Sequence, residues 1–148
     1  LSSYGTCYFV FYRKEDEGKC SIRYSRLING KQETPVKMSA EINTGNEIAH
    51  PYIAPDESYL MWDVVREDGY GGSDIYISFR AKDDIWMPAM NLGDTINTEL
   101  EESSPGLSPD GKYLFISRGE WKVKEDGSTY WVGKPYWVDA QIIENLRP

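Results

Sequence analysis

Short apolar runs separated by polar turns follow one another along this chain. In the middle of the sequence they predict four strands, near residues 50–54, 58–65, 73–80 and 85–92. The runs are rich in β-branched and aromatic residues and end at Pro-Asp or Gly clusters, which favours antiparallel strands joined by turns. The pattern therefore predicts an all-β chain with little helix.

The same pattern recurs at a nearly fixed spacing. The first matching positions, such as Pro35 and Pro88, are 53 residues apart, and later ones, such as Pro55 and Pro109, are 54 apart. The matching segments are 21–35 with 74–88, 42–44 with 96–98, and 51–60 with 105–114. A partial copy without its opening strand precedes them. We therefore divide the chain into a partial unit at 1–45 and full units at 46–99 and 100–148.

One turn of the repeat has a clear physical basis. In the Ser-Pro-Asp-Gly sequence at residues 108–111, Pro109 favours a φ near −65° and Gly111 tolerates a positive φ. Residues 55–58, Pro-Asp-Glu-Ser, are a weaker copy of this turn in the preceding unit.

Tandem four-stranded units of this length are typical of β-propellers. The sequence Ser-Pro-Asp-Gly-Lys-Tyr-Leu-Phe at residues 108–115, with Asp-Ile-Tyr at 74–76, resembles the blade repeat of the TolB-like (WD40-like) bacterial β-propellers. The resemblance covers nearly the whole chain and implies about three blades of four antiparallel strands, a partial or half propeller. Residues 135–146 resemble the exit strand and terminal helical turn of such a protein.

The resemblance also implies a partner and a location. A closed propeller needs at least about four blades, so three blades need either the remaining blades of a longer chain or a second copy as a homodimer. The family is periplasmic, which implies a periplasmic or extracellular location.

Composition narrows the range of partners. The net charge of −8 repels a phosphate backbone, so we expect no nucleic acid ligand. The apolar runs are far shorter than the roughly 20 residues that a helix needs to span a bilayer. We expect a soluble segment.

The inner strands carry the first candidate ligand-binding residues. His50, the sole histidine, opens the inner strand of the middle unit three residues after Glu47. Glu47 aligns with Glu101, and Glu102 is adjacent. Such residues converge on one face at the mouth of a propeller channel. They bind a metal only if three or four meet in space; because loop carboxylates are usually solvated, we expect neither a metal nor a cofactor.

A longer loop in the last unit supplies further candidates. Tyr136 lies 60 residues after Tyr76, whereas the preceding strand is offset by 54, so this loop is longer by six residues. It carries Trp121, Tyr130 and Trp131, and exposed aromatic residues suit sugars or peptides. The alternative, which we favour, is that these residues pack as an extended hairpin.

The sequence contains none of the usual nucleophile or zinc-hydrolase motifs. The favoured hypothesis is a non-enzymatic binding or scaffold module that recognises protein, peptide or glycan through one propeller face. The alternative is part of a hydrolase or lyase acting on glycan or peptide, with Glu47 and Glu101 as acid and base. A third is a propeller that controls access to a peptidase domain encoded outside this chain.

Overall fold

The computed structural model describes residues 1–12, 14, 18–83 and 85–148, and within them the chain is all-β with one short helix. This confirms the predicted all-β class. The elements are β1 Cys7–Tyr12, β2 Cys20–Ser25, β3 Leu27–Ile28, β4 Lys31–Gln32, β5 Val36–Lys37, β6 Asn46–Ile53, β7 Tyr59–Val65, β8 Asp74–Phe79, β9 Met90–Asn91, β10 Glu101–Leu107, β11 Tyr113–Val123, β12 Thr129–Asp139 and α1 Gln141–Leu146. No helix in the described ranges is long and apolar enough to cross a membrane.

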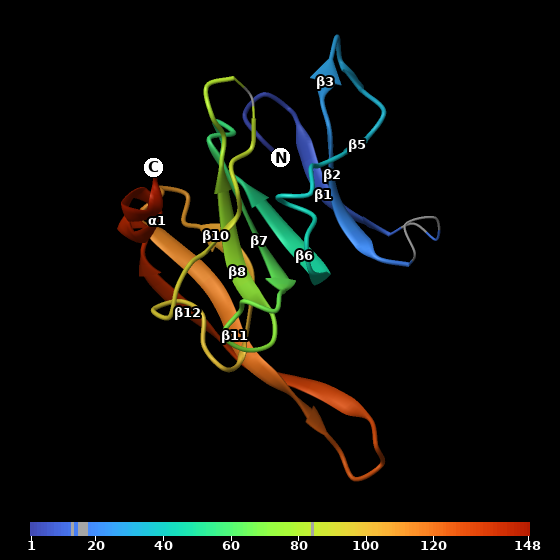
Figure 1. Ribbon diagram of the computed structural model, residues 1–148, viewed down its shortest axis with the longest axis vertical. Helices are drawn as coiled ribbons and strands as arrows, with labels where there is room; N and C mark the ends of the chain where they lie inside the picture. Colours follow the sequence, from blue (N-terminus) through green and yellow to red (C-terminus); the bar gives the residue numbers. More distant parts are fainter. Residues whose placement is uncertain (13, 15–17, 84) are drawn as a thin grey trace.

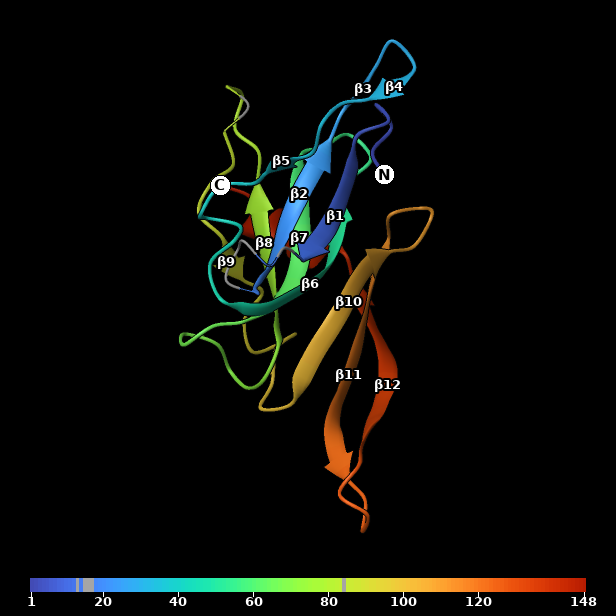
Figure 2. The same cartoon turned by 90° about the vertical axis from the view of Figure 1, so that its right-hand side faces the viewer.

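Three antiparallel sheets lie next to one another (Figure 1). The first sheet has the order β1-β2-β5, the second β6-β7-β8-β9 and the third β10-β11-β12, while β3 and β4 form a separate small hairpin. Strand β6 contacts both β1 and β10, so the second sheet lies between the other two. The far part of the β11–β12 hairpin extends away from the rest of the chain in both views (Figures 1 and 2).

The second sheet confirms the four strands expected from the middle of the sequence. Strand β7 pairs with β6 on one side and with β8 on the other, with Tyr59 opposite Phe79. The fourth strand is shorter than expected, because only Met90 and Asn91 pair regularly with β8 and Arg80 forms an isolated bridge with Trp86.

The third sheet differs from a four-stranded unit, because its described part has three strands. The additional residues of its loop extend β11 and β12 as one hairpin, with Trp121 opposite Trp131 and Lys122 opposite Tyr130. This confirms the extended-hairpin interpretation of that loop. The expected terminal strand and helical turn are also present, as the end of β12 and α1.

Two apolar cores fill the spaces between the sheets. Side chains alternate along β7: Leu60 and Trp62 belong to the core shared with Ile22 of the first sheet. Tyr59 and Met61 point the other way, into the core shared with Leu114 of the third sheet. Because successive side chains of a strand point to opposite faces, a strand covered on both sides is apolar throughout.

A pair of asparagines anchors corresponding loops in the two repeats. The side-chain Oδ1 of Asn97 accepts a hydrogen bond from the Ile75 N–H at 2.8 Å, and its Nδ2 donates to the Ile75 carbonyl at 2.9 Å. Asn43 makes the same two bonds with Ile22, at 2.7 and 3.0 Å. The repeated Ile-Asn-Thr sequence therefore has a structural role, since it joins each loop to a strand.

The two copies of the Pro-Asp turn also match. Gly111 has a φ of +71° and its counterpart Glu57 has a φ of +60°. A left-handed glutamate is unusual, but the buried carboxylate of Glu57 accepts hydrogen bonds from Arg80 and from the Tyr8 hydroxyl. These contacts help to offset the backbone strain.

Candidate functional site

Strands β6 and β10, each at an edge of its sheet, carry the same irregularity. The pairing with β7 shifts register between Ala49 and Tyr52, and the pairing of β10 with β11 shifts between Ser103 and Gly106. His50 and Ser104 lie in these bulges with φ of +43° and +56°. A positive φ at a residue other than glycine costs about 1–3 kcal/mol and is found preferentially at functional sites. A β-bulge also changes the direction in which a side chain points.

A pocket of about 590 Å³ lies at these two bulges, between the second and third sheets. Five of the seven residues selected from the sequence line it: Glu47, His50, Glu101, Trp121 and Trp131. The other lining residues are Cys20, Ile48, Ala49, Asp63, Ser73, Ser103, Ser104 and Ser117. The structure therefore joins two groups of candidates that the sequence analysis treated separately: the residues of β6 and β10, and the tryptophans of the long hairpin.

Asp63 is one of the pocket residues that the sequence analysis missed. It is buried in β7, and its Oδ1 lies 2.9 Å from His50 Nδ1 on β6 and accepts the Ser104 N–H of β10 at 2.9 Å. Burial raises the pKa of Asp63, and the hydrogen bonds from Ser104 and His50 offset part of this rise. Asp63 thus orients the imidazole and links two sheets. The available signal was an aspartate between Trp62 and Val64 in an otherwise apolar run.

The surroundings of Glu101 shift the pKa of its carboxyl group. Burial raises its pKa, and the nearby charges of Glu47 and Asp63 raise it further, while a hydrogen bond from the Trp121 side chain lowers it. Like charges close together make it costly to ionise every carboxyl group. The pocket therefore holds carboxylates that repel one another.

The two tryptophans form the aromatic part of the pocket. Their ring centroids are 5.7 Å apart, and the ring planes meet at 66°. Two opposed glycines, Gly119 and Gly133, make room for the Trp131 ring: a Cβ at Gly133 would lie 2.5 Å from Trp131 Nε1, and one at Gly119 would lie 2.8 Å from Trp131 Cζ2. Glycine at both positions lets the Trp131 ring lie close to the strand backbone.

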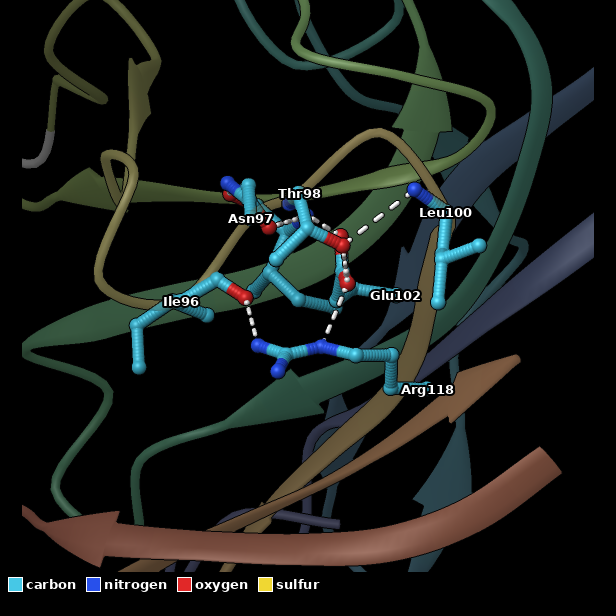
Figure 3. A network of polar contacts seen from close by, with 7 residues as sticks. Ile96, Asn97, Thr98, Leu100, Glu102 and Arg118 are labelled. Atoms are coloured by element: carbon cyan, nitrogen blue, oxygen red, sulfur yellow. Dashed lines mark hydrogen bonds and ion pairs between the residues drawn. The ribbon is translucent and has the colours of Figure 1, made fainter.

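Glu102 lies outside the pocket, in a buried polar network (Figure 3). Its carboxylate accepts hydrogen bonds from Arg118 Nε at 2.7 Å, from the Thr98 N–H at 2.8 Å and from Thr98 Oγ1 at 2.7 Å. Arg118 also donates to the Ile96 carbonyl at 2.7 Å. This glutamate is thus fully engaged within the chain.

Tyr130 also lies outside the pocket. It is exposed on the hairpin, opposite Lys122, with the Lys124 ammonium 5.6 Å from its ring centroid. Its ring therefore faces the far part of the hairpin.

Within the described part of the chain, no three His, Cys, Asp or Glu side chains are grouped closely enough to hold a metal ion. Comparison of the chain with protein-family models, with curated proteins and with solved structures found no match.

The electrostatic coupling in the pocket gives a direct prediction. Glu47→Gln removes a like charge and should lower the pKa of Glu101, whereas Trp121→Phe removes the stabilising hydrogen bond and should raise it. Titration of the glutamate carboxyl carbons by NMR measures both shifts. A change in the same direction in both variants would contradict this geometry.

Proposed function

We propose that this chain consists of β-propeller blades of the TolB-like type and acts as a non-enzymatic binding module for protein, peptide or glycan. Its three consecutive antiparallel sheets, its repeated asparagine anchors and its repeated bulges on β6 and β10 support this reading. In a propeller the inner strands surround a central channel. The proposed binding face is the one where His50 and Ser104 lie.

One observation carries the proposed site: candidates from two distant parts of the sequence meet in one pocket. Glu47 and His50 come from β6, Glu101 from β10, and Trp121 and Trp131 from the long hairpin. Ligand sites in proteins are typically concave, with aromatic walls and a few convergent polar groups. This pocket combines both features.

The ring requires completion in this proposal. Either a second copy pairs its three sheets with these, or further blades belong to the same protein. The molar mass in solution distinguishes the two: twice 17.0 kDa supports a pair of half rings, and 17.0 kDa supports additional blades elsewhere. With this proposal goes a periplasmic or extracellular location, which the resemblance of the sequence implies.

A second candidate function is a hydrolase or lyase that uses the same pocket. The observation in its favour is that Glu47 and Glu101 line one pocket, where burial and the Glu47 charge raise the pKa of Glu101, the direction that suits a general acid. In that case Glu101→Gln abolishes turnover of a glycan or peptide, whereas in a binding module it changes only affinity.

Arrays of immobilised peptides and oligosaccharides test the binding proposal. We expect Trp121→Ala to reduce the binding affinity at least about tenfold, since truncating a central aromatic residue of a binding site often costs about 2 kcal/mol of binding free energy. Trp137→Ala is the matched control, because Trp137 is exposed and packs on Tyr113 outside the pocket. Equal losses in both variants, or no binding to either array, would contradict the proposal.

A further inference from the structure

The pocket carries an excess of negative charge. Three carboxylates, those of Glu47, Asp63 and Glu101, line it, and the described lining residues include neither lysine nor arginine. Two buried glutamates outside the pocket each have an arginine partner: Glu102 is paired with Arg118 and Glu57 with Arg80. In the pocket, by contrast, Glu47 and Glu101 lie together, and the described lining residues supply no arginine or lysine to pair with them.

The aromatic wall of the pocket suits a cation. The two indoles of Trp121 and Trp131 meet at a steep angle, and Trp121 donates its N–H to Glu101. The face of an indole attracts cations, more strongly than any other aromatic side chain. Carboxylate and indole faces therefore attract the same kind of group.

A third observation concerns a buried hydroxyl group at the pocket. Ser73 lines the pocket and is 8% exposed, yet its Oγ is buried without a hydrogen-bond partner among the described residues. A buried hydroxyl without a partner costs about 1–3 kcal/mol. A polar group of a bound ligand would satisfy it.

We propose that the ligand of this pocket presents a lysine or arginine side chain of a protein or peptide, with its cationic group between Glu101 and the two indoles. This inference rests on the proposed binding function and names its ligand class. A neutral sugar can stack on the indoles, but it leaves the carboxylates of Glu47 and Glu101 without a counter-charge. A basic side chain satisfies both parts of the pocket, and its neighbouring backbone offers a partner for Ser73.

Titration with short capped peptides tests the inference. Four peptides of the form acetyl-Gly-Gly-X-Gly-Gly-amide carry lysine, arginine, glutamine or norleucine at X, and a chitooligosaccharide serves as the glycan probe. The readout is the indole N–H signals of the full chain in two-dimensional NMR. We expect the lysine and arginine peptides to shift the signals of Trp121 and Trp131 but not that of Trp137, and the norleucine peptide to shift none.

Two variants of equal net charge separate a local effect from a general one. Glu101→Gln should weaken binding of the lysine peptide about tenfold, the loss expected for one charge-assisted contact. Glu120→Gln should leave it unchanged, because Glu120 is exposed, pairs with Lys122 and lies outside the pocket. Equal affinity for the lysine and norleucine peptides, or wild-type affinity in Glu101→Gln, would overturn the inference.

The outcomes also separate this inference from the proposed function. If the chitooligosaccharide or the neutral peptides shift Trp121 and Trp131 as much as the basic ones, the binding function stands and the cationic ligand does not. If no probe shifts these signals, both proposals fail.

Discussion

Replacing Glu102 by alanine is expected to lower the free energy of unfolding by about 3 kcal/mol or more. The Glu102 side chain is fully buried, and Arg118, which it pairs with, is 20% exposed. The substitution leaves the guanidinium without its counter-charge and removes the acceptor for two donors of Thr98. Urea unfolding followed by tryptophan fluorescence measures the loss.

Glu120→Ala is the control, on the neighbouring strand β11. Its pair with Lys122 is exposed, so the expected change is at most about 1 kcal/mol. If Glu102→Ala unfolds at the wild-type urea concentration, the structural role that we assign to Glu102 is wrong. The residue then returns to the set of ligand-binding candidates suggested by the sequence.

Asn97→Ala is the second substitution with a large expected effect, a loss of about 2–4 kcal/mol. The amide makes two hydrogen bonds with the backbone of the fully buried Ile75 and donates a third to Asn91 at 2.7 Å. Alanine leaves these backbone groups without partners and away from water. Thermal and urea unfolding measure the difference.

The repeat supplies a matched comparison for this prediction. Asn43 makes the equivalent bonds with Ile22 but is partly exposed, so water compensates more readily and Asn43→Ala should cost less. Asn145→Ala on the exposed face of α1 should change stability by less than about 0.5 kcal/mol. A loss at Asn97 no larger than that at Asn145 would show that the anchor contributes nothing to stability.

Local pattern was sufficient for much of the fold. The strands of the second sheet and the extended hairpin follow from apolar runs and turn residues, because each forms between segments close in sequence. The sequence pattern predicted a strand near 85–92, which is longer than the observed β9, because the apolar residues near Trp86 pack in the core without regular pairing.

The site was only partly accessible to sequence reasoning. The repeat alignment drew attention to Glu47, His50 and Glu101, and the longer loop to Trp121 and Trp131. Asp63 was missed because its neighbours predict a plain buried strand. Glu102 resembles its neighbour Glu101 in sequence, yet the two side chains leave β10 on opposite faces, one toward the pocket and one toward Arg118.

The sequence by itself determined the all-β class, the repeat and the type of residue available for binding, because these depend on short-range periodicity and turn chemistry. Only the tertiary structure decided which candidates meet. The packing of the second sheet on the third brings β6, β10 and the long hairpin together, and the shared hydrogen bonds of Asp63 join two of them. Contacts between residues so far apart in sequence depend on how the sheets pack, which local sequence patterns do not predict.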